Sequence, residues 1–199
     1  LQEAVASEET APDPSGMTPQ QQLDAIADRA HRFFDRLYAV ACDEIIPALG
    51  AHGIRLHSVP DIPDPRRAAL SPFFRDAVLP VLTPLAIDVS RPFPLLASLT
   101  LNLAVLLDSP DGDGPRLAIV QVPPGLPRLV PVADADGQSF VLLEEVIRLF
   151  LPQLFPGQRI LETSAIRLSR NAELELDDEG DRTHIDLVER QLRARRTSD

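Results

Sequence analysis

The sequence contains no lysine, because all 19 basic residues are arginine. A phosphate-binding loop of the GxxxxGK[ST] type and Schiff-base catalysis both need a lysine amine, so both are excluded. The single cysteine, Cys42, excludes an internal disulfide and a zinc site built from several cysteines. No apolar run is long enough to span a membrane, and the first residues lack the basic region of a signal peptide. We therefore expect a cytoplasmic protein without a membrane span.

Positive charge is scarce as well. The 30 acidic residues outnumber the arginines and give a formal net charge of −11. A surface with this balance repels polyanions on average, which argues against nucleic acid as a partner. A local arginine cluster can still bind phosphate, so the charge excludes a broad polyanion groove and not every phosphate contact.

The remaining composition is that of a globular domain. Hydrophobic residues make up 44% of the chain, which is enough for a core, and the 20 prolines are about twice the usual share. Runs of predicted strands and helices follow each other without regular βα alternation. We predict an α+β fold, with a small antiparallel or mixed sheet packed against helices and preceded by a long N-terminal helix.

The long helix is predicted over residues 18–49. Thr18 is its N-cap, Pro19 occupies the first helical position, and Gln21 completes a capping box. One apolar stripe follows at helical spacing: Leu23, Ile26, Ala27, Ala30, Phe34, Leu37, Ala41 and Ile45. Residues 1–17 are acidic and small, and we expect them to be disordered.

The rest of the chain alternates between apolar segments and turn residues. We predict strands at 54–56, 99–107, 116–122, 129–132 and 166–176, and helices at 65–79, 141–151 and near the C-terminus. Pro72 is expected to break or restart the second helix. The aspartate-rich segments 111–114 and 134–137 predict turns, because an EF-hand loop needs further acidic ligands.

The residues themselves assemble no catalytic constellation. The four histidines, His31, His52, His57 and His184, have no neighbouring base or glycine loop, so surface or capping positions are favoured over phosphoryl acceptors. Arg91 and the cluster around Arg193 are candidate phosphate contacts. The alternative interpretations are a hydrogen-bond donor within a loop for Arg91 and a solvated helix face for Arg193.

One block is more specific than the rest. Residues 81–107 read VLTPLAIDVSRPFPLLASLTLNLAVLL, with the distinctive positions Thr83, Pro84, Asp88, Pro92, Phe93, Pro94 and Asn102. This block resembles the middle segment of polyphosphate kinases of the first family. Segments at 73–76, 122–131, 154–157 and 167–176 match the same family in the same order. The family has histidine where this chain has Arg91.

The resemblance implies a division of the chain and a role. Residues 1–53 would be the tail of the N-terminal helical domain, and residues 54–199 the head, or middle, domain. The family enzyme reversibly transfers the γ-phosphoryl group of ATP to polyphosphate through a phosphohistidine, with magnesium. Its catalytic residues lie in domains that this sequence does not contain. We therefore expect no catalytic, cofactor-binding or metal-binding residue here.

For this portion the resemblance implies a structural role in a homo-oligomer, with the catalytic domains of the same chain as partners. Two alternatives stay open. One is a polyphosphate- or nucleotide-binding module that uses Arg91, Arg128 and Arg193, and the other is a degenerate stand-alone paralogue. A piece cut from a longer chain and a stand-alone relative are not distinguished by the sequence.

The proline-rich block is predicted to be structural. Its prolines favour an extended path without regular hydrogen bonds, so side chains must satisfy the backbone. Asp88 and Asn102 are short polar residues among apolar neighbours. We expect both to fulfil this role from buried positions, and the alternative is that both face water.

Overall fold

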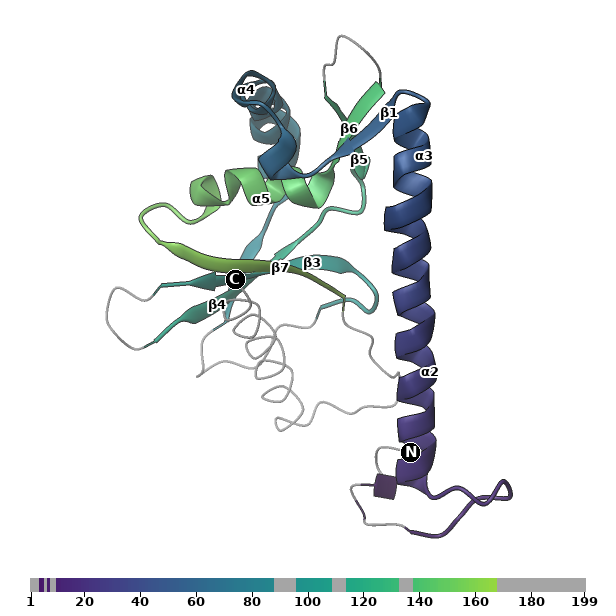
Figure 1. Ribbon diagram of the computed structural model, residues 1–199. Helices are drawn as coiled ribbons and strands as arrows, with labels where there is room; N and C mark the ends of the chain where they lie inside the picture. The colour runs from purple at the N-terminus through teal and green to yellow at the C-terminus, as the bar shows by residue number, and fades with distance from the viewer. Residues whose placement is uncertain are drawn as a thin grey trace. The chain divides into compact units, whose positions relative to one another are not determined.

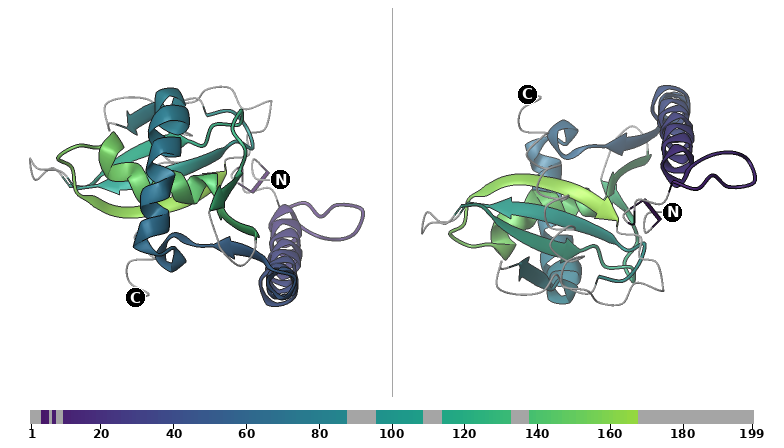
Figure 2. Two further views of the ribbon diagram at one scale, coloured as in Figure 1. Left: turned by 90° about the horizontal axis from the view of Figure 1, so that it is seen from above. Right: turned by 90° about the horizontal axis from the view of Figure 1, so that it is seen from below.

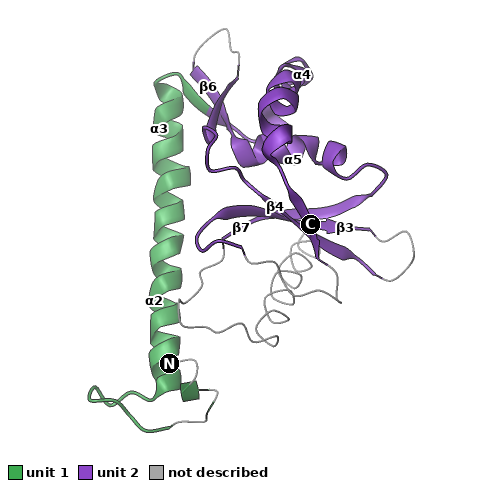
Figure 3. Cartoon of the chain, turned by 180° about the vertical axis from the view of Figure 1, so that it is seen from behind, with its two compact units in different colours: residues 1–55 green, residues 56–199 purple. Residues whose placement is uncertain are grey.

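The computed structural model describes residues 4–5, 7, 10–87, 96–108, 114–132 and 138–167. The chain divides into two compact units, residues 1–55 and residues 56–199 (Figure 3). Unit 1 is mainly helical, whereas unit 2 contains a four-stranded antiparallel sheet, most of a smaller sheet and further helices (Figure 1). The predicted α+β class, with a small sheet and a long N-terminal helix, is confirmed.

The helix of unit 1 begins as its sequence predicts. Helix α2 (Pro19–Ala39) carries the complete capping box, in which Gln21 N–H donates to Thr18 Oγ1 and Thr18 N–H donates to Gln21 Oε1. It continues through a π-helical segment (Val40–Ile45) into α3 (Ile46–Ala51). Pro19 is the only buried residue among these three segments.

Unit 2 is built on a four-stranded antiparallel sheet in the order β2-β4-β3-β7. Its strands are β2 (Pro84–Ile87), β3 (Leu101–Leu107), β4 (Arg116–Gln121) and β7 (Ile160–Arg167). Side chains of β3 and β4 alternate between two apolar clusters, one on each face of the sheet. The sequences of β3 and β4 are therefore almost continuous apolar runs, which is typical of strands buried on both faces.

Helices cover one face of that sheet. Helix α4 (Asp64–Phe73), its π-helical extension (Phe74–Val78) and α5 (Leu143–Leu154) lie on the same side (Figure 2). Phe74 is fully buried and stacks on Phe150 of α5, with ring centroids 4.7 Å apart. This contact joins the two helices above the sheet.

A second sheet has the order β1-β6-β5, with β1 (Ile54–His57), β5 (Leu129–Val132) and β6 (Gln138–Leu142). Short 3-10 helices at Val59–Asp61 and Leu79–Val81 flank α4 and its extension. Val130, Val132 and Val141 contribute to the same cluster as α5. The two sheets therefore share one core with the helices.

The proline-rich block departs from its prediction at its start. Residues 84–87 form β2, paired with β4 from Pro84 opposite Val120 to Ile87 opposite Leu117. The expected path without regular hydrogen bonds is wrong for this part. A proline at the first residue of an edge strand is tolerated, because the outer side of the strand needs no donor.

Two further boundaries differ. Residues 138–142, predicted partly as helix, form β6, and α5 begins only at Leu143. A short apolar run is ambiguous between strand and helix, and here cross-strand pairing with β5 decides. Strand β7 begins at Ile160, six residues before the predicted start. Its first residues are half-buried without alternation, so the sequence carries no period-two signal there.

Of the two alternatives predicted at Pro72, the break is wrong. Pro72 lies inside α4, and the helix continues as a π-helix from Phe74 to Val78. Proline removes one backbone donor, and the wider turn that follows accommodates the change in hydrogen bonding. Pro152 likewise lies inside α5, which continues to Leu154, beyond the predicted end at residue 151.

Candidate functional site

The turn that leads into β3 is strained. Leu99 has a φ of 62°, the only positive φ among non-glycine residues in the described ranges, and its side chain is 62% exposed. Thr100 fixes the turn, because its N–H and its Oγ1 both donate to the carbonyl of Ala97. A left-handed conformation is unfavourable for a bulky side chain, so the surrounding turn holds Leu99 in place.

Asn102 stabilises this turn from the first residues of β3. It is fully buried, and its Nδ2 donates to the carbonyl of Thr100 at 2.9 Å and to Thr100 Oγ1 at 3.2 Å. Its Oδ1 has no hydrogen-bond partner among the described residues. The expectation that Asn102 is buried and hydrogen-bonds to a backbone group beside the proline-rich block is confirmed.

Arg128 lies beside the start of α5. Its Nε donates to Glu144 Oε1 at 3.1 Å, and its Nη2 donates to the same oxygen at 2.5 Å. The Glu144 side chain is only 5% exposed, whereas that of Arg128 is 54% exposed. Hydrogen bonding to Glu144 raises the pKa of Arg128 above its usual value. Glu144 also lies in the first turn of α5, where the helix dipole favours a negative charge.

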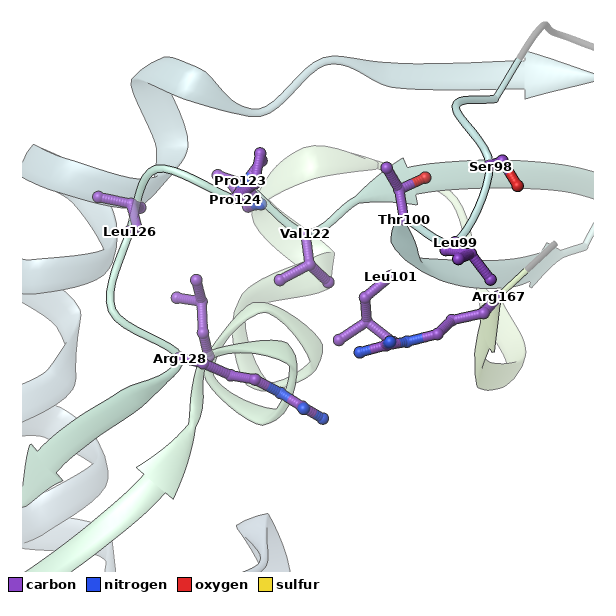
Figure 4. Close-up of a pocket in the computed structure, with 11 residues that line it drawn as sticks. Ser98, Leu99, Thr100, Leu101, Val122, Pro123, Pro124, Leu126, Arg128 and Arg167 are labelled. Carbon is purple, nitrogen blue, oxygen red and sulfur yellow. The ribbon is translucent and has the colours of Figure 1, made fainter. Parts of the chain in front are cut away.

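These residues border a pocket of about 350 Å³ within unit 2. The lining consists of residues 98–101, residues 122–124, Leu126, Arg128, Leu143 and Arg167. Arg128 and Arg167 extend toward the middle of the pocket from opposite sides (Figure 4). Arg167 ends β7, and its side chain makes no hydrogen bond or ion pair with the described part of the chain. The pocket therefore combines apolar walls with two cationic groups.

The predicted site residues are only partly placed. Thr83 is exposed and precedes β2, which begins with Pro84. Arg128 is placed at the pocket. Six other predicted residues lie outside the described residues: Asp88, Arg91, Pro92, Phe93, Pro94 and Arg193. Their roles stay predictions.

The histidines form no catalytic arrangement in the described ranges. His31 and His52 are exposed, as expected. His57 is half-buried, and its Nε2 is 3.2 Å from Ser139 Oγ, a contact between β1 and β6. His184 lies outside the described residues.

The described residues hold no cluster of three histidine, cysteine, aspartate or glutamate side chains suited to a metal ion. Among them, no helix is both long and apolar enough to cross a membrane.

Arg167, which lines the pocket, and Glu144, which binds Arg128, were not predicted as site residues. Glu144 is 16 positions from Arg128, so no local sequence pattern indicates that the two side chains pair. Its position in the first turn of an apolar helix was the available signal. Arg167 belongs to a strand segment that resembles the family, but nothing in its sequence neighbourhood places it opposite Arg128.

Comparison with known proteins identifies the family. A family model for the polyphosphate kinase middle domain matches residues 66–199, and a model for the polyphosphate kinase N-terminal domain matches residues 1–57. The chain belongs to the polyphosphate kinase family. The resemblance noted in the sequence is confirmed.

Curated relatives agree with this assignment. The chain is 40% identical over 189 residues to a polyphosphate kinase of Mycobacterium marinum, covering 91% of this chain and 26% of that protein. It is 41% identical over 182 residues to a polyphosphate kinase of Exiguobacterium sibiricum, covering 90% and 25%. The chain thus spans about a quarter of the length of the curated relatives it matches.

A solved structure shares the fold. The crystal structure of polyphosphate kinase from Porphyromonas gingivalis matches with a TM-score of 0.71 and 32% identity. The match covers 78% of this chain and 25% of that protein.

Proposed function

We propose that this chain acts as a non-catalytic head-domain portion of a polyphosphate kinase and that its role is structural, in the assembly of a homo-oligomer. In this proposal the whole enzyme transfers the γ-phosphoryl group of ATP to polyphosphate in the cytoplasm. ATP and magnesium act at the catalytic domains, and this portion itself holds no cofactor. The match to the model of the polyphosphate kinase middle domain supports this division of roles.

The observation that carries the proposal is the apolar face of the unit 1 helix. Its large apolar side chains are exposed, with Phe33 at 64%, Leu37 at 50% and Tyr38 at 66%. Others on the same helix are exposed too: Ile26, Phe34, Ile45, Ile46 and Leu49. A contiguous apolar surface of this kind marks an interaction site.

The charges beside this face favour a second copy of the same chain as its partner. On a helix of about 3.6 residues per turn, Arg29 and Arg36 lie on one side of the apolar stripe, and Asp24 and Asp35 lie on the other. When two such helices pair in parallel about a twofold axis, the basic side of each meets the acidic side of its partner. Antiparallel pairing places like charges together instead. We infer a parallel pair.

Light scattering over a range of protein concentrations tests this assembly. The wild-type chain should reach the mass of a dimer, because association buries the apolar face. Leu37→Glu places a charge in that face and should leave a monomer. Arg32→Glu, on the opposite side of the helix, is the matched control and should still dimerise. A wild-type chain that stays monomeric at the highest concentration contradicts the proposal.

A separate assay tests the non-catalytic role. The pure chain, incubated with ATP and magnesium, should form no polyphosphate above a blank without protein. Polyphosphate synthesis by the chain alone contradicts the proposed division of roles.

A further inference from the structure

The walls of the pocket beside Leu99 are mainly apolar. Leu99, Leu101, Val122, Leu126 and Leu143 all line it, together with two prolines. Its volume of about 350 Å³ lies in the range of small-molecule sites. A surface of this kind favours an apolar group over a fully hydrated ion.

The same pocket retains free hydrogen-bonding capacity for an anion. Arg128 uses its Nε and Nη2 toward Glu144, while its Nη1 bonds to no described residue. The Arg167 side chain makes no hydrogen bond or ion pair with the described residues. Planar guanidinium groups bind carboxylates and phosphates through paired hydrogen bonds, so the two arginines can hold an anionic group between them.

The net charge of the side chains at the pocket favours one class of anion. Glu144 offsets Arg128 at close range, which leaves the charge of Arg167 uncompensated among these three residues. One net positive charge suits a monoanion. A polyphosphate chain brings many charges to a protein with a formal net charge of −11, and repulsion disfavours it.

The strained turn is a second and independent sign of a site. Leu99 keeps a φ of 62° although its side chain is largely exposed and lines the pocket. Because the Leu99 side chain is exposed, its packing within the chain contributes little energy to offset the unfavourable backbone conformation. Contact with a bound apolar group would supply that energy and is a physical reason for a leucine at this position.

We propose that the Arg128–Arg167 pocket binds an apolar group that carries a single carboxylate. The carboxylate lies between the two guanidinium groups, and the apolar body packs on Leu99, Leu101 and Val122. Two sources share this chemistry, namely a free small carboxylate and the C-terminal residue of a peptide. The inference does not rest on the proposed role in assembly.

Binding of two probes to the full 199-residue chain distinguishes these sources. Hexanoate represents the free carboxylate, and N-acetyl-leucine represents a peptide C-terminus. The readout is the NMR shift of the methyl groups of Leu99, Leu101 and Val122 and of the arginine Nε–Hε groups. Hexanoate should bind about tenfold more tightly than acetate, because its extra methylenes leave water. N-acetyl-leucinamide, which lacks the charge, should bind at least about tenfold more weakly than N-acetyl-leucine.

Arginine variants test the assignment of the pocket. Arg167→Gln should weaken the binding of both carboxylates about tenfold, because it removes the uncompensated charge. Arg159→Gln is the matched control, because Arg159 is exposed, precedes the same strand and does not line the pocket. This variant should change the affinity less than twofold. Neither residue pairs with a buried group in the described ranges, so both variants should fold.

A glycine variant separates binding from stability. Leu99→Gly relieves the positive φ and removes an apolar wall, so it should weaken hexanoate binding without lowering the melting temperature. A lower melting temperature would show that Leu99 serves packing instead and would count against the proposal.

Three results would overturn the proposal. The first is the absence of a saturable shift with either carboxylate. The second is tighter binding of pyrophosphate than of hexanoate, which would indicate a polyanion site. The third is an equal loss of affinity in Arg159→Gln and Arg167→Gln, which would indicate a general charge effect.

Discussion

The helix of unit 1 and the sheet of unit 2 differ in what surrounds their apolar side chains. In unit 2, β3 and β4 are buried on both faces, and Leu103, Val105, Ile119 and Val120 are fully inaccessible to solvent. In unit 1, the helix has a complete capping box but leaves its phenylalanines exposed. Unit 2 therefore carries its own core, whereas the order of unit 1 comes from local bonds and its apolar face is available to a partner.

The largest difference should appear when the same residue type is removed from each unit. Phe74→Ala should lower the free energy of unfolding by about 3–5 kcal/mol, because Phe74 is fully buried against Phe150. Phe34→Ala, at a 51% exposed position, should change it by less than about 0.5 kcal/mol. Urea denaturation at low protein concentration measures both. Equal losses for the two variants would contradict the comparison.

The next effect concerns the ion pair at the start of α5. Arg128→Ala should lower the stability of unit 2 by about 1–3 kcal/mol, because it leaves the buried carboxylate of Glu144 without its partner. Arg75→Ala removes an arginine whose ion pair with Asp76 is exposed on both sides, and it should cost less than about 1 kcal/mol. Thermal denaturation of both variants provides the measurement. If Arg75→Ala proved as costly, burial of Glu144 would not be the cause.

A smaller effect is expected at the turn before β3. Asn102→Ala should lower stability by about 1–2 kcal/mol, because it removes a fully buried amide and the half-buried Thr100 loses the hydrogen bond to its carbonyl. Asp88→Ala is predicted to lower the melting temperature as well, and Arg91→Ala less so. A melting temperature that stays the same in Asn102→Ala would show that this buried amide does not hold the turn.

The smallest effect lies at the start of the unit 1 helix. Thr18→Ala removes the capping box and should destabilise the first turns of α2 by about 1 kcal/mol. Hydrogen exchange should rise at residues 21–25 and stay unchanged in β3 and β4. Thr10→Ala, at an exposed threonine outside any helix, is the control. Faster exchange throughout unit 2 would contradict the independence of the two units.

The elements predicted correctly from the sequence are those set by local chemistry. The capping box of Thr18 and Gln21 lies within four residues, and the apolar runs of β3 and β4 need no partner to be recognised. The predicted helix at 141–151 includes the last two residues of β6, because only the pairing of β6 with β5 distinguishes strand from helix there. The sequence did not predict β2, because Pro84 and the nearby prolines suggest a loop, whereas a proline at the start of an edge strand is tolerated.

The candidate site was less accessible to prediction. The sequence predicts Arg128 as a phosphate contact, but its hydrogen bonds to Glu144 depend on the packing of β5 against α5. Arg167 reaches the same pocket only because β7 pairs with β3, more than 50 residues away in sequence. Pairings over such distances leave no local pattern. The buried position of Asn102 was predictable, because a lone polar residue stood in an apolar strand.

Pulsed electron spin resonance on a spin label at Cys42 tests the central claim, that the exposed helix face of unit 1 pairs with a second copy. Cys42 is exposed, lies in the π-helical segment of that helix, and is the single cysteine of the chain. A parallel pair places the two labels at the same level, about 20 Å apart given helices in direct contact. An antiparallel pair crossing at Ala30 would place them ~36 Å apart. The account predicts the shorter distance, which Leu37→Glu abolishes and Arg32→Glu preserves. No dipolar coupling in the wild-type chain, or the longer distance, would contradict it.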